Sequence, residues 1–319
     1  MTPSAAPAAV SPRVICLGHT AFDATWTVER LPEGDGKTRA LSYAERGGGM
    51  AATAAVAAAR LGASAQFWGR AGHDAAGAAM RDELAAYGVN VKCLRLFDGA
   101  RSSASAVIVD AQGERMIINF RGAALLAETD WLPLDAVLAA DAVLADPRWP
   151  EGAHALFDAA RRHGVPSVLD GDVAESDVFD ALLPSVDFAV FSEPGLAGYV
   201  GEPVSAFDVA RALRFARERG CRIAAVTLGE RGLAWHDGAS LQRLPAFPVR
   251  AVDTNGAGDV FHGALVFALG ARWTVRDAFR FSAAVAALKC TRHGARDGVP
   301  DLAAALSFLA ATGEPIGAC

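Results

Sequence analysis

The segment Asp253–Ala264, with the sequence DTNGAGDVFHGA, combines small residues with carboxylates and lies directly before a predicted helix. Gly256, Ala257 and Gly258 have little or no side chain, so their backbone N–H groups can converge on an anion at the positive end of that helix. An acidic residue is unusual at such a place. Its presence is explained if Asp259 takes a proton from a hydroxyl while the N–H groups stabilise charge on a transferring phosphoryl group. The simpler alternative is a helix with an acidic first turn that follows a glycine turn.

The rest of the chain alternates short apolar runs with stretches of helical length. The expected strands are 14–18, 66–68, 89–91, 141–145, 167–170, 188–191 and 223–228. The expected helices are 51–61, 75–87, 152–163, 204–219, 256–270, 275–289 and 301–311. This alternation predicts an α/β protein with a mainly parallel sheet and helices on both faces. Ligands of such sheets lie beyond the carboxyl ends of the strands.

Two stretches interrupt the alternation and have the pattern of antiparallel strands. They are residues 37–46, and the pair 105–109 and 115–120 around the turn 110–113. Because they lie within the first half of the chain, we expect a small sheet that projects from the main one as a lid, built from about 23–46 and 104–122. Residues 1–12 are rich in Ala and Pro and lack Lys and Arg, so we expect a disordered tail there and no secretory signal.

The composition indicates an ordinary soluble protein. The chain has 319 residues, of which 52% are hydrophobic and 21% are charged, so it can bury a core. A net charge of −6 argues against a nucleic-acid partner, which requires clustered Lys and Arg. The five cysteines are odd in number and form no C-x-x-C pair, which favours a reducing cytoplasm over disulfides or a zinc site. No uncharged run is long enough to span a bilayer, so we expect no membrane partner.

Two nucleotide-binding patterns are incomplete. Gly36-Lys37-Thr38 lacks the earlier glycine of a P-loop, because position 31 is Leu31. Residues 47–52 fit G-x-G-x-x-A, but a dinucleotide fingerprint requires an acidic residue at the end of the next strand, where Gly69 stands. An NAD-dependent oxidoreductase is therefore the alternative from another enzyme class.

Several motifs, in order along nearly the whole chain, resemble those of the ribokinase-like (PfkB) carbohydrate kinases. They are Gly18 with Asp23, the run 48–62, the run 68–77, the run 226–232, and the segment 253–264 described above. The resemblance implies a three-layer α/β/α kinase domain over 13–319, with a mainly parallel sheet and a small antiparallel β-lid. It implies that Asp259 is the catalytic base and that Gly256, Ala257 and Gly258 form the anion hole for the β- and γ-phosphates.

The resemblance also assigns residues to the two substrates and to metal ions. Asp23 and Gly49 match sugar contacts. Thr227, Gly229 and Gly232 match the strand and loop that hold ATP. Asp253 and Asn255 match the place where some relatives bind a monovalent cation such as K⁺, next to the anion hole.

The chain departs from the family pattern at two places. Thr53 stands where the family has an asparagine that contacts the sugar. An N-x-x-E motif that organises Mg²⁺ would fall at residues 192–195, where Ser192 and Gly195 replace its Asn and Glu. We therefore expect either that Glu193 acts on Mg²⁺ through water or that the phosphates hold the metal.

Three further residues suggest an anionic substrate. Lys37 and Asn119 lie on the expected lid strands, and Arg148 follows a strand that ends near Asp146, so the three side chains can meet at the far end of the sugar. An arginine fork beside a lysine suits a phosphate or a sulfonate.

These features predict an ATP- and Mg²⁺-dependent sugar kinase. The expected substrate is a ketohexose or an anionic, phosphorylated or sulfonated, ketohexose derivative, and a ribose or nucleoside kinase of the same fold is the alternative. A non-catalytic nucleotide or sugar sensor is the alternative outside catalysis. The outer face of the lid could pair with a second copy, which would give a homodimer.

Overall fold

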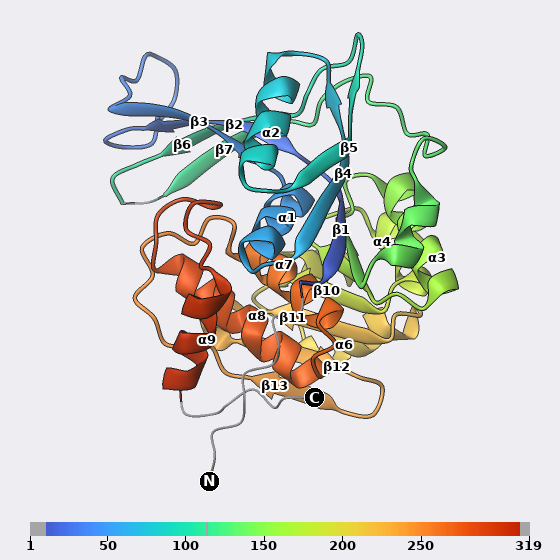
Figure 1. Cartoon of the computed structure of the whole chain (residues 1–319). Coiled ribbons are helices and arrows are strands. Elements are labelled where there is room, and N and C mark those ends of the chain that lie inside the picture. The colour runs from blue at the N-terminus through green and yellow to red at the C-terminus, as the bar shows by residue number, and fades with distance from the viewer. Residues whose placement is uncertain (1–10, 113, 313–319) are drawn as a thin grey trace.

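The apolar runs of the sequence form one large sheet at the centre of the molecule. Figure 1 shows the computed structural model of the chain, which describes residues 11–112 and 114–312. The strands of the large sheet are, in spatial order, β13 (Leu241–Leu244), β12 (Leu233–His236), β11 (Ile223–Thr227), β10 (Phe188–Ser192), β9 (Ser167–Gly171), β8 (Ala142–Ala145), β1 (Arg13–Gly18), β4 (Ser64–Gly72) and β5 (Asn90–Phe97). From β11 to β5 all neighbours are parallel, whereas β12 and β13 add an antiparallel edge.

Helices cover both faces of the sheet and give two apolar cores. One core contains residues of α1 (Met50–Arg60), α2 (Ala75–Ala86), α7 (Ala257–Gly270), α8 (Val275–Cys290) and α9 (Leu302–Ala311). The other contains residues of α3 (Pro150–His163), α4 (Ser176–Leu182), α5 (Glu193–Tyr199) and α6 (Val209–Glu218). Short 3₁₀ turns lie at Leu134–Ala139, Leu183–Ser185 and Gly229–Arg231. The central strands β8 and β9 are buried along their whole length, because helices cover them on both sides.

A second, four-stranded sheet projects from the large one, at the upper left of Figure 1. Its order is β3 (Ser42–Gly48), β2 (Ala21–Thr27), β6 (Ala104–Val109) and β7 (Arg115–Phe120). The outer pairs β2–β3 and β6–β7 are antiparallel as expected, but the central pair β2–β6 is parallel. The two pairs come from insertions far apart in sequence, so nothing in their turns fixes how they meet. We call this four-stranded sheet the small sheet.

The strand that was expected to begin at Lys37 begins instead at Ser42. Lys37 lies in an exposed loop, so the prediction that it stands on a strand was wrong. Gly34 and Gly36 in this loop have positive φ angles of 69° and 130°, which are not strand conformations. Pairing with β2 resumes only at Leu41, whose N–H donates to the carbonyl of Thr27.

Other boundaries differ for local reasons. The helix expected from residue 204 begins at Val209, because the Asp208 carboxylate accepts hydrogen bonds from the N–H groups of Ala210 and Arg211 and caps it. The hairpin of β12 and β13 was not predicted, because its strands have four residues each. Within the described part of the expected tail, the Ser11 hydroxyl donates to the Gly62 carbonyl. Residues 1–10 lie outside the described residues.

None of the helices in the described ranges is long and apolar enough to cross a membrane. The cysteines of those ranges, Cys16, Cys93, Cys221 and Cys290, form no disulfide, and Cys319 lies beyond them.

Candidate active site

The first turn of α7 faces an open space near the carboxyl ends of β9 and β10. Gly256 precedes the helix with φ of 72°, a left-handed conformation that is strained for residues with a β-carbon. Gly258 has open space beside it, because a β-carbon there would meet no heavy atom within 4 Å. Asp259 is the third helical residue and is partly exposed. N–H groups without intrahelical partners and a carboxylate therefore share this turn.

Desolvation makes the partly exposed Asp259 a stronger base than a fully exposed aspartate. Desolvation is the main cause that raises the pKa of its carboxyl to about 8, and the nearby charge of Asp170 adds to the effect. The charge interaction with His262 lowers the pKa of Asp259. A carboxylate whose pKa lies near neutral pH is suited to accept a proton from a hydroxyl.

A buried acid and a buried imidazole lie beneath this turn. The Asp170 side chain is 5% exposed, and its Oδ2 has no hydrogen-bond partner. That oxygen lies 3.3 Å from Nδ1 of His262. The same Nδ1 is 2.8 Å from the Gly258 carbonyl oxygen, and Nε2 is 3.0 Å from the Val190 carbonyl oxygen. His262 thus connects the first turn of α7 to strand β10.

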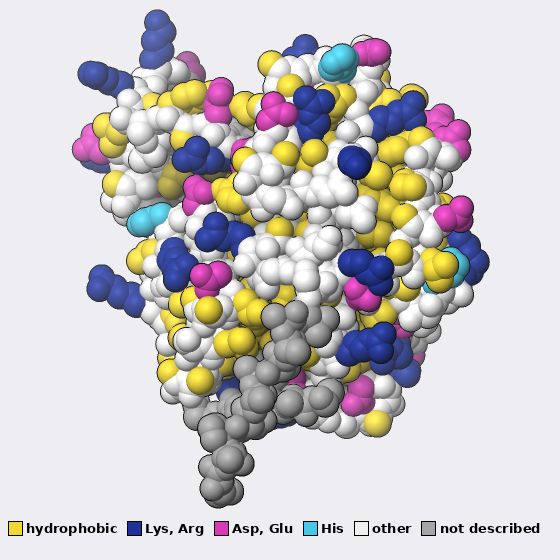
Figure 2. All heavy atoms as spheres, in the orientation of Figure 1, with side chains coloured by type: hydrophobic (Ala, Val, Ile, Leu, Met, Phe, Trp, Pro, Cys, Tyr) yellow, Lys and Arg dark blue, Asp and Glu magenta, His cyan; other side chains and the backbone are white. Residues whose placement is uncertain are grey.

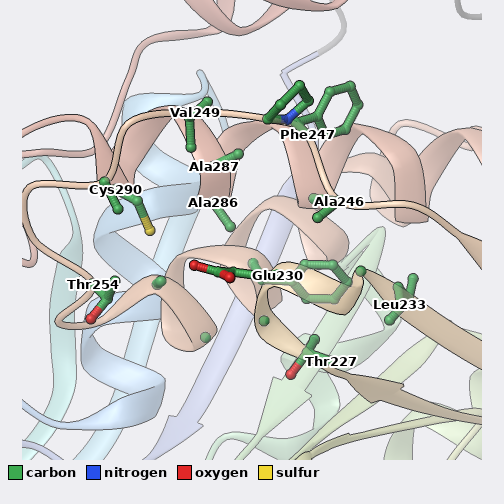
Figure 3. Close-up of a pocket in the computed structure, with 18 residues that line it drawn as sticks. Thr227, Glu230, Leu233, Ala246, Phe247, Val249, Thr254, Ala286, Ala287 and Cys290 are labelled. Carbon is green, nitrogen blue, oxygen red and sulfur yellow. The ribbon is translucent and has the colours of Figure 1, made fainter.

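A cleft of about 520 Å³ opens beside the same turn (Figure 3). The residues that line it come from the end of β11 and the turn after it, the segment 246–251, the start of α7 and the last turns of α8. Five residues predicted from the sequence are among them: Thr227, Gly229, Gly232, Ala257 and Gly258. Apolar side chains form most of the wall, and Glu230 lies across the middle of the cleft in Figure 3. The cleft suits a flat, partly apolar group attached to an anion.

Helix α1 begins next to the first turn of α7. A β-carbon at Gly263 would lie 2.3 Å from the Ala54 carbonyl oxygen, so the two helices pack with their backbones in near contact. One at Gly256 would lie 3.7 Å from the Thr53 methyl group. The residue that precedes α7 therefore lies next to the first turn of α1.

The loop before α1 is held by Asp146, which follows β8 and is fully buried. Its carboxylate accepts backbone hydrogen bonds from His19 at 2.7 Å, Ala51 at 3.1 Å and Arg148 at 2.9 Å. These bonds join the ends of β1 and β8 to the start of α1. Gly49 stands at the junction with φ of 95°, and a β-carbon there would lie 2.4 Å from the His19 carbonyl oxygen.

The predicted sugar contacts on the small sheet lie in one row. Asp23 is paired with Arg46 on one side and with Ser105 on the other, and Ser105 is paired with Asn119. Directly paired residues point to the same face of a sheet, so these side chains share a face. The Asn119 amide donates to the Ser105 hydroxyl at 3.1 Å. Burial raises the pKa of Asp23, while its hydrogen bond with Ser105 lowers it.

Thr53 has a structural partner that the sequence did not indicate. Thr53 is 1% exposed, and its hydroxyl accepts a hydrogen bond from Nε of Arg296 at 3.3 Å. The same guanidinium donates to the Gly48 carbonyl at 2.8 Å and to Glu83 at 3.0 Å. Arg296, which is 3% exposed, therefore supports the glycine loop from below.

Of the three residues expected to meet around an anionic group, Asn119 lies on β7 and Arg148 follows β8 as expected, whereas Lys37 lies off the sheet. Lys37 lies in the exposed loop between β2 and β3, and Asn119 is bonded to Ser105. Arg148 donates to the Val173 carbonyl at 2.7 Å and lies 3.5 Å from the Asp172 carboxylate. Its positive charge and that of Arg121 both lower the pKa of His19, for which burial is the largest cause.

The two predicted metal contacts have protein partners. Glu193 forms an ion pair with Arg231. Asp253 accepts hydrogen bonds from the N–H groups of Asn255 and Gly294, each at 2.8 Å. These two bonds are the main favourable contacts that lower the pKa of Asp253. Among residues 11–112 and 114–312, no cluster of three or more His, Cys, Asp or Glu side chains could hold a metal ion.

Five polar residues near the site were not predicted: His19, Asp146, Asp170, Lys289 and Arg296. All except His19 are buried. Asp146 and Asp170 were detectable in principle, because each is an acidic residue at the end of an apolar strand. Nothing local distinguishes Lys289 or Arg296 from a surface cation.

The comparisons with known proteins agree with this geometry. The model of the pfkB family of carbohydrate kinases matches residues 11–302. An ATP-dependent ribose-1-phosphate kinase of Halopiger xanaduensis is 30% identical over 93% of this chain and 98% of its own length. A crystal structure from Agrobacterium tumefaciens, provisionally assigned as a ribokinase, has a TM-score of 0.89 at 33% identity and covers 96% of this chain and 100% of its own.

Ribokinase of Arabidopsis thaliana, solved with ribose and ATP, is also similar. Its TM-score is 0.84 at 26% identity, over 94% of this chain and 99% of its own. The fold and the site thus define a sugar kinase of the ribokinase type, a phosphotransferase with an alcohol group as acceptor. The chain belongs to the pfkB family of carbohydrate kinases. The predicted three-layer fold and family resemblance are confirmed, and the oxidoreductase alternative is set aside.

Proposed function

We propose that the chain transfers the γ-phosphoryl group of ATP to a hydroxyl of a sugar that carries an anionic group. The observation that carries the proposal is the place of Asp259, on a turn that faces the cleft on one side and the glycine loop of α1 on the other. ATP occupies the cleft, where Thr227, Gly229 and Gly232 lie next to its adenine base and ribose. The sugar lies against Asp23 and Gly49.

The chain's own groups then divide the reaction. Asp259 takes the proton of the sugar hydroxyl while the hydroxyl oxygen forms a bond to the γ-phosphorus. The bond between the γ-phosphorus and the oxygen that leaves with ADP breaks at the same time. The N–H groups of the Gly256–Gly258 turn stabilise charge on the phosphoryl oxygens. Asn255, next to this turn, helps to position the nucleotide. The small sheet, with the row that contains Asp23, positions the sugar and excludes water.

Mg²⁺ fits this site mainly through the nucleotide. Since no three-residue metal cluster exists in the described chain, the phosphates and water supply most of the ligands, as is common for Mg²⁺. Glu193 remains the proposed contact through water. The neighbouring Ser192 donates its hydroxyl to Asp172 at 3.0 Å. The metal neutralises charge on the phosphates when it is bound.

The position of Arg148 supports a sugar that carries an anionic group. Arg148 is 20% exposed, and its backbone N–H and that of His19 both donate to the carboxylate of Asp146. A guanidinium group next to a sugar site suits a phosphate or sulfonate. The relative that acts on ribose-1-phosphate supports an anionic sugar, and the ribokinases support a pentose. The test therefore compares three classes of substrate: an anionic ketohexose, an anionic pentose and a nucleoside.

The test is release of ADP with a panel of neutral and anionic sugars and nucleosides. We expect turnover with an anionic sugar, and we expect Arg148→Ala to raise its KM about 10-fold or more while the KM for ATP stays unchanged. Lys37→Ala, a cation removed from the exposed loop, is the control and should change neither. Equal turnover of ribose and its phosphates, with no effect of Arg148→Ala, would contradict the anionic substrate. A non-catalytic sensor would release no ADP with any sugar.

We also propose that two copies associate through the outer face of the small sheet. Side chains alternate along a strand, so Trp26 and Ile118 lie on the face opposite to Asp23 and Asn119. That outer face carries Trp26, Tyr43, Ile108, Met116, Ile118 and Phe120. Tyr43, Ile118 and Phe120 are each at least half exposed. Figure 2 shows apolar side chains among the charged ones on this sheet, at the upper left. An apolar face of this kind is typical of an interface between subunits.

The measurement for this second proposal is the molar mass in solution by light scattering. We expect the mass of two chains, and we expect Ile118→Asp to reduce it to one chain, because a buried carboxylate in the interface would lack a partner. Ile117→Asp is the matched control, since Ile117 is equally apolar and exposed but points to the inner face. A wild-type chain that is monomeric at every concentration would overturn the proposal.

A further inference from the structure

A fully buried lysine lies behind the anion-hole turn and has no role in the mechanism above. Lys289 is in the last turn of α8, and its side chain is 0% exposed. Its ammonium group donates a hydrogen bond to the main-chain carbonyl of Asp253 at 2.8 Å. It also lies 3.7 Å from Oδ1 of the same residue. A buried ammonium group is costly unless its charge is offset, so its position requires an explanation.

The carbonyl that Lys289 contacts belongs to the loop that leads into the catalytic turn. Asp253 is three residues before Gly256, and its carboxylate joins the N–H of Asn255 to the N–H of Gly294. The N–H of Asp253 itself donates to the Cys290 carbonyl at 3.2 Å. Two segments, 252–256 and 290–294, are therefore fastened to each other around the ammonium group. Thr254 and Cys290, one from each segment, line the cleft proposed for ATP (Figure 3).

Charge gives this lysine a second effect. Several carboxylates stand near the place proposed for the phosphates, namely Asp253, Asp259, Asp170 and Asp172. The ammonium group offsets the charge of Asp253, which stays ionised because its hydrogen bonds lower its pKa. Without that positive charge, the carboxylate of Asp253 would repel the phosphates of the nucleotide.

An ammonium group and a potassium ion are alike in charge and similar in size, and both bind carbonyl and carboxylate oxygens. We propose that Lys289 is a positioning residue that supplies, from within the chain, the cation that holds the anion-hole loop, so that the kinase works without added K⁺. This inference rests on the proposed kinase function. It replaces the expectation of a monovalent cation at Asp253 and Asn255 with a tethered one.

The test compares cations in the wild-type enzyme and in Lys289→Ala. We expect the wild-type rate of ADP release to be the same in choline chloride and in potassium chloride at equal ionic strength. In choline, we expect Lys289→Ala to lose about 10²-fold in kcat, comparable to the loss of one anion-hole donor. K⁺ or NH₄⁺ should restore much of that loss, because the vacated space is lined by the same oxygens, whereas Li⁺ should restore little.

A readout without catalysis accompanies the kinetics. Because a ligand that binds only the native state raises its stability, K⁺ should raise the Tm of Lys289→Ala relative to choline and leave the wild-type Tm unchanged. Lys92→Met, a change at an exposed lysine of β5, is the control and should behave as wild type.

Three results would overturn the inference: a wild-type rate that K⁺ raises severalfold, full activity of Lys289→Ala in choline, or an inactive variant that no monovalent cation rescues or stabilises. Failure of the proposed function would look different. In that case the wild-type enzyme would release no ADP with any sugar in either salt, while the Tm comparison would still report on Lys289.

Discussion

Replacing Asp259 with asparagine should lower kcat about 10³-fold while ATP binding is largely retained. Asparagine has nearly the shape of aspartate but cannot accept the proton of the sugar hydroxyl at neutral pH. The first turn of α7 keeps its backbone N–H groups, so the phosphates keep their contacts. Steady-state ADP release and calorimetric binding of a non-hydrolysable ATP analogue measure the two effects separately.

The pH dependence gives the same variant a second readout. Asp259 acts as a base only when deprotonated, and its pKa is raised to about 8, so the wild-type kcat/KM for the sugar should fall as the pH drops below about 8. Asp259→Asn should lose this limb. The stability of the fold depends on pH in the opposite direction from the activity. A raised pKa of Asp259 favours the protonated native state, so the wild-type chain loses stability as the pH rises from about 4 to about 8. The variant should therefore be at least as stable as wild type at pH 8.

Asp277→Asn is the matched control for Asp259→Asn. Asp277 is also the third residue of its helix, α8, and accepts a hydrogen bond from the Thr274 hydroxyl at 2.8 Å. We expect a small loss of stability from the weakened cap and no loss of turnover. Near-normal turnover of Asp259→Asn, or an equal loss in both variants, would refute the role of the catalytic carboxylate.

Gly49→Ala should cost both stability and sugar turnover. The φ angle of 95° at Gly49 is strained for alanine, and the new methyl group would lie 2.4 Å from the His19 carbonyl oxygen and 2.6 Å from the Thr20 α-carbon. Both are backbone atoms that cannot move without disturbing the bonds of Asp146. Strain and overlap together should cost about 3 kcal/mol or more in the free energy of unfolding. The displaced loop should lower kcat/KM for the sugar, whereas the KM for ATP should stay unchanged.

The other end of α1 offers a control with the same strain and no overlap. Gly62 has φ of 99°, yet a β-carbon there would meet no atom within 4 Å. Gly62→Ala should therefore cost only the conformational strain, about 1–2 kcal/mol, and leave the kinetics unchanged. Chemical denaturation and ADP release measure both. If the two alanine variants behaved alike, close approach of the backbone at Gly49 would not be what the glycine provides.

The sequence predicted the parts of the site that are local in the chain. Gly256–Gly258 and Asp259 lie on consecutive residues, so their small side chains and the following helical pattern identified the turn before any tertiary contact was known. The alternation of apolar runs predicted the parallel sheet in the same way. The edge hairpin β12–β13 was not predicted, because four-residue strands leave too short a pattern.

The remaining parts of the site depend on contacts between distant residues. Arg296 donates to Thr53, which is 243 positions away, so no motif around Thr53 could reveal that its hydroxyl is already bonded. Lys37 was expected on a strand because strand propensity ignores the loop that Gly34 and Gly36 impose. The burial of Lys289 was equally invisible, since a lysine near the end of an amphipathic helix is ordinarily exposed.

Two of the connections between the small sheet and the rest of the molecule lie next to residues proposed to touch the sugar. Strand β2 starts three residues after β1 ends, and β3 ends at Gly48, next to the residue that precedes α1. Asp23 therefore lies near one of these connections, and Gly49 forms the other. A change in the angle of the small sheet would therefore also move the residues proposed to contact the sugar. The orientation of this sheet and the contacts to the sugar are thus coupled.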